Sequence, residues 1–229
     1  MKAFPGSGAH RPKVVVSLCD YSGNWPKPFH DAGYTVLCYD LKHGDDVTTL
    51  TAARIRNDAR SEVGGPGRVV GVFMACPCTD FTVSGAQYWP AKDADGRTAQ
   101  SLAVVDACLA LKDALRPVWW MLENPVGRLP KLRPDTLDKP RLYVDPYKYA
   151  HLADNVDAER YTKKTGLWGS FDANALKGLA QHNGGPIRTC AQGSWIQKLG
   201  GKSERTKELR SMTPVGLARA CYAVLSSNT

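Results

Sequence analysis

The sequence contains no apolar run long enough to cross a membrane. A membrane-spanning helix needs about 20 consecutive apolar residues, and charged residues or prolines interrupt every apolar stretch of this chain before that length. The first residues, MKAFPGSGAH, also lack the apolar stretch of a signal peptide. We therefore expect a cytoplasmic protein that makes no contact with a membrane, in which residues 1–12 form a flexible leader.

The seven cysteines show neither a disulfide framework nor a zinc-binding pattern. Their number is odd and most fall within predicted strands or helices, which favours reduced, buried thiols. Cys76 and Cys78 lie two residues apart, but no second cysteine pair and no histidine pair at zinc-ligand spacing accompanies them. The sequence therefore predicts no metal site, and it predicts that Cys76 packs in the core.

Internal repeats and low-complexity tracts are absent as well, and the apolar (43%) and charged (23%) fractions are those of an ordinary globular protein. Apolar runs of strand length alternate with helical segments, which is typical of βαβ units and a mostly parallel sheet. We predict strands at residues 14–19, 35–39, 69–75, 118–122, 141–144 and 165–168, and helices at residues 26–32, 48–60, 99–115 and 214–225. Residues 76–97 are predicted to be irregular.

These elements predict an α/β domain over residues 13–170, a small basic region over 171–210, and a C-terminal segment, 211–229, whose helix packs back on the domain. Thr213 is predicted to cap that helix, with Pro214 at its first position. Lysines and arginines exceed acidic residues by 30 to 22, and basic residues cluster between 188 and 219. This cluster favours a polyanionic partner, although a solvated surface explains it equally well.

Two predicted strands end abruptly at a reactive side chain beside a proline. The third strand leads into Pro77-Cys78, and the fourth leads into Glu123-Asn124-Pro125. Because ligands bind outside the carboxyl ends of strands in open α/β sheets, the thiol and the carboxyl group are predicted to meet at one edge of the sheet. This pairing suits covalent catalysis on an electron-poor ring.

The turns after the first two strands carry acidic residues where a nucleotide-like cofactor lies in such sheets. No G-x-G-x-x-G is present, which argues against a pyrophosphate cradle. S-adenosylmethionine has no phosphate and suits a sparser loop. An ordinary turn or cap role is the alternative for Asp20 and Asp40. The predicted cofactor-binding residues are Asp20, Tyr21, Ser22, Gly23, Asp40, Leu41, Asp46, Val47 and Pro77.

Four motifs occur in the order found in DNA cytosine-C5 methyltransferases. They are Asp20-Tyr21-Ser22-Gly23, Pro77-Cys78, Glu123-Asn124-Pro125 and Arg210-Ser211-Met212-Thr213-Pro214. Over about residues 13–169 and 210–225, the chain resembles a short, phage-type member of this family. The resemblance implies a Rossmann-like S-adenosylmethionine-dependent methyltransferase fold, DNA as the partner, a prokaryotic host cell and a monomer, with residues 171–210 facing the target.

The resemblance also implies roles for individual residues. Cys78 would add to carbon 6 of cytosine, which makes carbon 5 nucleophilic enough to accept a methyl group, and Glu123 would contact ring N3. Lys164 would reach the base carbonyl as a third catalytic residue, although the family usually has arginines in this stretch. The predicted contacts with the substrate and DNA are Asn124, Lys163, Arg188, Lys198, Lys202 and Arg205.

Two other functions stay open at this point. Asp145-Pro146-Tyr147 partly matches the Asp-Pro-Pro-Tyr-like loops of N6-adenine and N4-cytosine DNA methyltransferases, but it lacks the second proline. A catalytically silent relative that binds nucleic acid is the other. Full-length family members carry a large target-recognition domain where this chain has about forty residues, so we expect short or relaxed sequence specificity.

Overall fold

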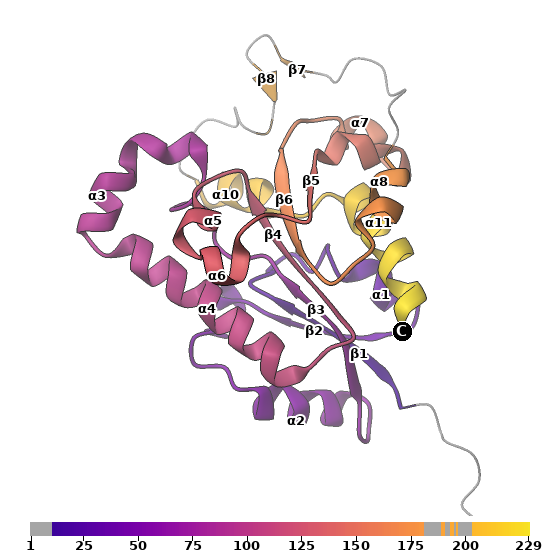
Figure 1. Cartoon of the computed structure of the whole chain (residues 1–229). Coiled ribbons are helices and arrows are strands. Elements are labelled where there is room, and N and C mark those ends of the chain that lie inside the picture. Colours follow the sequence, from indigo (N-terminus) through magenta and orange to yellow (C-terminus); the bar gives the residue numbers. More distant parts are fainter. Residues whose placement is uncertain (1–10, 181–188, 191–192, 195, 197–202) are drawn as a thin grey trace, which may run out of the picture.

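The structure is a computed structural model that describes residues 11–180, 189–190, 193–194, 196 and 203–229. At its centre is a six-stranded sheet of order β2-β1-β3-β4-β6-β5 (Figure 1). Its strands are β1 (Lys13–Leu18), β2 (Thr35–Tyr39), β3 (Arg68–Met74), β4 (Trp119–Pro125), β5 (Leu142–Val144) and β6 (Thr165–Gly169). A separate two-stranded ribbon consists of β7 (Thr189–Cys190) and β8 (Gly193–Ser194).

The sheet is mostly parallel, as the sequence predicts. Strands β2, β1, β3 and β4 run in one direction, β6 is antiparallel to β4, and β5 is antiparallel to β6. The chain passes from β1 outward to β2, and then returns to place β3 on the other side of β1. The carboxyl ends of β1 and β3 therefore flank the point where the strand order reverses, which is where ligands bind in open α/β sheets.

Helices cover both faces of the sheet, because alternate strand residues bury apolar side chains on opposite sides. Val14 and Val16 belong to a core cluster with α2 and α4, whereas Val15 belongs to a second cluster with α1 and α11. The main helices are α1 (Lys27–Asp31), α2 (Ala52–Glu62), α4 (Arg97–Leu115), α8 (Ala173–Gly178), α10 (Glu204–Ser211) and α11 (Val215–Leu225). This two-sided arrangement (Figure 1) confirms the predicted Rossmann-like α/β fold.

Several short helices were not predicted, because none spans enough residues to show a helical period. They are η1 (Leu41–His43), η2 (Val83–Tyr88), α3 (Trp89–Ala94), α5 (Leu129–Leu132), α6 (Pro134–Leu137), η3 (Pro146–Leu152), α7 (Val156–Glu159) and η4 (Ser226–Asn228), where η marks a 3₁₀ helix. Two of them, η2 and α3, occupy the segment that was predicted to be irregular, so that prediction is wrong. None of the described helices is both long and apolar enough to span a membrane.

The cap predicted for the C-terminal helix is also wrong. Helix α11 begins at Val215, and its N-cap residue is Pro214, which offers no side-chain hydrogen bond. The carboxylate of Glu159 on α7 instead accepts hydrogen bonds from the backbone N–H groups of Val215 and Gly216, the latter at 2.7 Å. A cap supplied from a distant segment satisfies the same unpaired donors as a local one, but no local sequence pattern signals it.

We expect replacement of Glu159 by alanine to destabilise the fold. The change leaves two N–H groups at the start of α11 without their acceptor, and the loss of a helix cap costs about 1–2 kcal/mol. Urea denaturation should show a lower midpoint for Glu159→Ala than for the wild type, with Glu159→Gln between them because its amide oxygen still accepts. An unchanged midpoint for Glu159→Ala would show that this contact does not stabilise α11.

Candidate active site

The segments that follow β3 and β4 lie beside each other. These strands are parallel neighbours with Met74 opposite Leu122, so Cys78 and Glu123 are carried to the same edge of the sheet, as predicted. The side chain of Asn124 is completely buried, and its Nδ2 donates a hydrogen bond to the backbone oxygen of Cys76 at 3.2 Å. Asn124 therefore ties the two segments together. Its Oδ1 is also buried and has no hydrogen-bond partner among the described residues, and the predicted contact of Asn124 with the substrate stays a prediction.

Further along, the two loops pair backbone to backbone. Val83 N donates to Val126 O at 3.1 Å, Arg128 N donates to Phe81 O at 2.8 Å, and an antiparallel bridge joins Thr82 to Gly127. A Cβ atom on Gly127 would lie 2.0 Å from the carbonyl oxygen of Phe81, far inside van der Waals contact. Only glycine allows the loop of Glu123 to approach the loop of Cys78 this closely.

A buried ion pair supports the loop that carries Cys78. Lys92 Nζ lies 2.8 Å from Asp80 Oδ1 and donates to the backbone oxygen of Thr79 at 2.7 Å. Ser101 donates to the other oxygen of the same carboxylate at 2.5 Å. Burial opposes ionisation of Asp80, but the hydrogen bonds from Lys92 and Ser101 outweigh it and lower the pKa of this carboxyl group. Helix α3 thereby anchors the residues directly after Cys78.

Arg128 anchors the other loop in a similar way. Its guanidinium group makes two hydrogen bonds of 2.7 Å to the Asp93 carboxylate, one of 2.8 Å to Thr98 and one of 3.1 Å to the backbone oxygen of Asp80, and it stacks 4.8 Å from the ring centre of Trp89. The hydrogen bonds from Arg128 and Thr98 lower the pKa of Asp93 to about 2. This network could not be predicted from the sequence, because its members are distant in the chain and carry no local motif.

Glu123 is held in a fixed orientation from β6. Thr165 donates a hydrogen bond to Glu123 Oε1, and Lys163 Nζ lies 4.0 Å from the same oxygen. The side chains of Glu123 and Lys163 are only 15% and 16% exposed. Both contacts are made to Oε1, so Thr165 and Lys163 fix the orientation of the carboxyl group through this one oxygen.

The charges of Lys163 and Glu123 shift the pKa of Cys78 in opposite directions. Burial raises the pKa of the Cys78 thiol, the positive charge of Lys163 lowers it, and the negative charge of Glu123 raises it further, so the net direction is upward. Both charges therefore act on the thiol. Lys163 and Glu123 form an ion pair at the edge of the sheet that the segment of Cys78 also reaches, and the three residues come from three different elements.

Lys164, the lysine that the sequence assigned to catalysis, lies elsewhere. It is exposed, and its Nζ lies 5.6 Å from the ring centre of Tyr143. Lys163 occupies the position near the thiol instead. Neighbouring residues of an extended segment project to opposite sides, so an offset of one residue exchanges the two lysines. The structure thus pairs Lys163 with Glu123, while the predicted roles of the two lysines toward the substrate stay predictions.

At the carboxyl end of β1, a tight turn is built around Asp20. Its carboxylate accepts hydrogen bonds from Ser17 Oγ at 3.0 Å, from Ser22 Oγ at 2.9 Å and from Gly23 N at 2.9 Å, and the residue is 4% exposed. Asp20 thus holds the turn, which is the role left open as its alternative. Gly23 has a φ of +63°, a conformation that favours glycine.

The residues after β2 form a more open surface beside this turn. Asp40 Oδ1 accepts a hydrogen bond from Lys42 N at 2.9 Å, and Leu41 is 74% exposed. Asp46 caps its own turn through Thr48, whose hydrogen bonds lower the pKa of this exposed carboxyl group. The other predicted cofactor residues differ in burial, since Tyr21 and Pro77 are exposed, Ser22 is half-buried and Val47 is buried.

Helix α10 is linked to the segment after β2. Lys42 Nζ lies 2.7 Å from Glu208 Oε1 on α10 and 4.9 Å from the ring centre of Tyr21. Arg205 is exposed on the same helix. The other predicted phosphate contacts, Arg188, Lys198 and Lys202, lie outside the described residues.

The Asp-Pro-Tyr segment also has a defined place. Asp145 follows β5, the outermost strand, and its carboxylate accepts a hydrogen bond from Lys163 N at 3.0 Å. Burial raises the pKa of Asp145, although the hydrogen bond from Lys163 and two nearby lysines oppose this. Three strands separate β5 from β1 in the sheet. The segment is therefore remote from the turn after β1.

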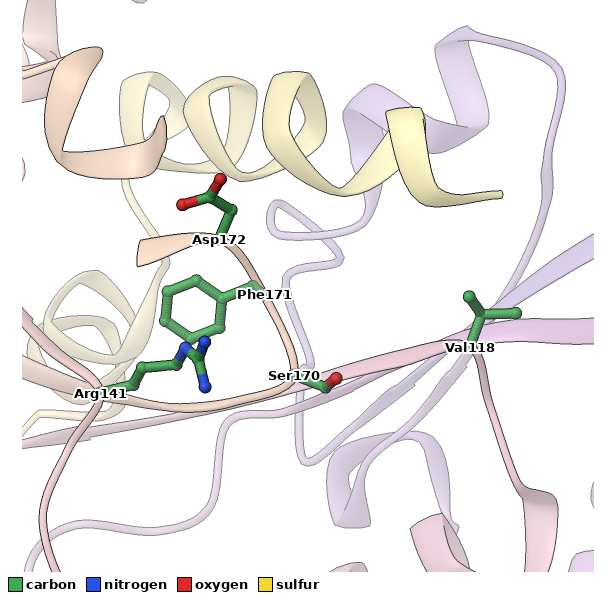
Figure 2. A pocket seen from close by; sticks show the side chains of 5 residues that line it. All are labelled: Val118, Arg141, Ser170, Phe171 and Asp172. Atoms are coloured by element: carbon green, nitrogen blue, oxygen red, sulfur yellow. The ribbon is translucent and has the colours of Figure 1, made fainter. Parts of the chain in front are cut away.

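A surface hollow lies near the start of β4, at the end of the sheet opposite to the carboxyl ends of β3 and β4. Its volume is about 620 Å³, and Val118, Arg141, Ser170, Phe171 and Asp172 line it (Figure 2). Val118 precedes β4, whereas Cys78 and Glu123 lie near the ends of β3 and β4, so this hollow is separate from the candidate site. Figure 2 shows Arg141 beside Phe171, and the guanidinium carbon lies 5.9 Å from the ring centre.

No protein-family model and no curated protein matches the chain. Among solved structures, the chain is similar to a protein described as a candidate DNA modification methyltransferase, encoded within a prophage of E. coli. The TM-score is 0.42 and the sequence identity is 15%, over 68% of this chain. The matched region is 45% of that protein, so this chain spans less than half of its length.

The contact between the two loops predicts that Gly127→Ala is strongly destabilising. The new methyl group would overlap the carbonyl oxygen of Phe81, and overpacking of this kind costs about 1–3 kcal/mol or more. Gly85→Ala is the matched control, because a Cβ atom there would lie 3.6 Å from its nearest neighbour, an ordinary contact. Thermal unfolding should show a fall of several degrees for Gly127→Ala alone. Equal melting temperatures for the two variants would contradict the close approach.

The charges around Cys78 predict opposite effects on its reactivity. Because the pKa of Cys78 is raised above its ordinary value of 9.0, its alkylation by iodoacetamide should still accelerate above pH 9.0. Glu123→Gln should speed the reaction at pH 8, since removal of a negative charge lowers the pKa of the thiol. Lys163→Met should slow it. Peptide mapping measures each thiol separately.

Cys38 is the internal control in the same samples. Burial and the charges of Asp20 and Asp40 raise its pKa to about 12, and neither Glu123 nor Lys163 contributes. Its alkylation rate should therefore be equal in all three proteins. A Cys78 rate that is insensitive to both substitutions would show that the three groups do not interact.

Proposed function

We propose that the chain is an S-adenosylmethionine-dependent methyltransferase that transfers a methyl group to carbon 5 of cytosine in DNA. One observation supports the proposal: Cys78 and Glu123 follow neighbouring parallel strands toward the same carboxyl edge of the sheet, and Lys163 Nζ lies 4.0 Å from Glu123 Oε1. A thiolate can add to a pyrimidine ring, and a carboxyl group can stabilise the charge that develops on the ring during addition. The sequence resemblance supports the same assignment.

Cys78 is the proposed nucleophile. Its thiolate would form a bond to carbon 6 of the base, and the ring electrons displaced toward carbon 5 would make that carbon a nucleophile. The positive charge of Lys163 favours the thiolate over the thiol. After carbon 5 has accepted the methyl group, it loses its proton to a base, the sulfur–carbon bond breaks, and the thiolate is restored.

Glu123 is the proposed partner of the ring. Thr165 and Lys163 contact its Oε1, so Oε2 is the oxygen that we assign to ring N3 and the exocyclic amine. A hydrogen bond at N3 stabilises the charge that develops as sulfur adds to the ring. The low exposure of this side chain strengthens such a contact, because competing water is excluded.

The turn after β1 suits S-adenosylmethionine, which would supply an electrophilic methyl group when bound. Gly23 adopts a left-handed conformation that lets the backbone approach a ligand, and Asp20 fixes that turn internally. Asp40 is half-buried and uses Oδ1 for Lys42 N, so its Oδ2 is the acceptor that we assign to a ribose hydroxyl. The exposed side chains of Tyr21 and Leu41 offer apolar contact beside it.

For the target, the proposal is duplex DNA from which the cytosine is turned out of the stack, since an enzyme cannot reach its carbon 6 inside a helix. The basic region over residues 171–210, with Arg205 exposed on α10, is assigned to backbone phosphates. Methylation of adenine N6 or cytosine N4 is less well supported, because the Asp145 carboxylate already accepts a backbone hydrogen bond from Lys163.

Incubation with labelled S-adenosylmethionine and duplex DNA, followed by nucleoside analysis, tests the proposal. The wild type should produce 5-methylcytosine, and Cys78→Ala should reduce the product below detection because it removes the proposed nucleophile. Glu123→Gln should lower the rate by a factor of about 10²–10⁴, the usual contribution of an acid–base group. Cys221→Ala, which removes a buried thiol in the second core cluster, is the matched control.

The products distinguish the alternatives. N6-methyladenine or N4-methylcytosine would overturn the proposed reaction in favour of the amino-group methyltransferases. Activity of Cys78→Ala equal to that of the wild type would overturn the covalent mechanism. A wild-type protein that binds DNA and cofactor but methylates none of the substrates would indicate a catalytically silent relative.

A further inference from the structure

Three cysteines from separate parts of the chain meet next to the strand-order reversal. Cys19 follows β1 directly, Cys76 follows β3 and Cys108 lies on α4. Their three Sγ atoms all lie within 4.8 Å of one another, and those of Cys19 and Cys108 are 3.8 Å apart. None of the three has a role in the proposed methyl transfer.

The spacing of these sulfur atoms matches ligands around one metal ion. In a tetrahedral zinc site with Zn–S bonds of about 2.3 Å, two sulfur ligands lie about 3.8 Å apart. The Sγ atoms of Cys19 and Cys108 already have this separation. The Sγ atom of Cys76 lies no more than 4.8 Å from either of them. A disulfide would require two sulfurs at about 2.05 Å and would leave the third cysteine unused.

The surroundings favour a cation that prefers sulfur. Cys76 and Cys108 are buried in the same apolar cluster, at 3% and 0% exposure, whereas Cys19 is partly exposed and offers a route of entry. The charged groups that act on Cys19 are Asp40 and Asp46, which are both negative. Soft thiolate ligands select zinc over the magnesium and calcium that prefer oxygen.

We propose that Cys19, Cys76 and Cys108 form a structural zinc site. Binding of one Zn²⁺ forms three sulfur–zinc bonds, breaks three S–H bonds and releases three protons to solvent, and water on the Cys19 side completes the tetrahedron. The ion would join α4 to both segments at the strand-order reversal. Cys19 directly precedes Asp20, and Cys76 lies two residues before Cys78, so the site would hold both the turn after β1 and the Cys78 loop. This proposal does not depend on the proposed function.

Metal content of the purified full chain is the first test. Protein that is reduced, incubated with Zn²⁺ and dialysed should retain about one zinc ion per chain, by mass spectrometry of the metal. Cys108→Ala should retain close to none. Cys221→Ala, which removes an equally buried cysteine of the other core cluster, should retain the wild-type amount. Equal zinc in wild type and Cys108→Ala would overturn the site.

A second measurement uses the wild type alone, so that it stands even if Cys108→Ala fails to fold. Titration with Co²⁺ should produce thiolate-to-cobalt charge-transfer absorption that saturates at one ion per chain and disappears when Zn²⁺ is added. Added Zn²⁺ should also raise the melting temperature, since a ligand bound only by the folded state stabilises it. Absence of the charge-transfer band in fully reduced protein would contradict the proposal.

Discussion

The arrangement of the candidate site depends on the backbone contact between the loops after β3 and β4. The bonds between Val83 and Val126 and between Arg128 and Phe81 leave room only for glycine at position 127. Without that approach, Cys78 and Glu123 would share a sheet edge but would have no fixed separation. The ion pair Lys92–Asp80 fixes the loop after β3, and the ion pair Arg128–Asp93 fixes the loop after β4.

This rigid support explains how weak local signals can yield a defined site. Cys78 and Glu123 are placed by neighbouring parallel strands, whereas Lys163 arrives from the segment ahead of the antiparallel strand β6. The charges of Lys163 and Glu123 act on the thiol in opposite directions. The reactivity of the thiol would therefore be set by two side chains whose positions depend on sheet register.

The sequence predicted what short-range patterns encode. Apolar runs of strand length located all six strands of the central sheet, and the parallel direction of β3 and β4 followed from the alternation of strands and helices. Contacts between distant residues were beyond reach: the Glu159 cap of α11, the pairing of Lys163 with Glu123, and the grouping of Cys19 with Cys108. Each depends on tertiary packing, and the lysine assignment additionally depends on a one-residue register.

The most direct test of the central claim, that Cys78 attacks a pyrimidine held by Glu123, is covalent trapping on duplex DNA that contains 5-fluorocytosine. Fluorine at carbon 5 cannot leave as a proton does, so the sulfur–carbon bond should persist after methyl transfer. We predict a protein–DNA adduct in the presence of S-adenosylmethionine, with the modified peptide mapped to Cys78. No adduct on DNA that the enzyme methylates, or an adduct at another cysteine, would contradict the account.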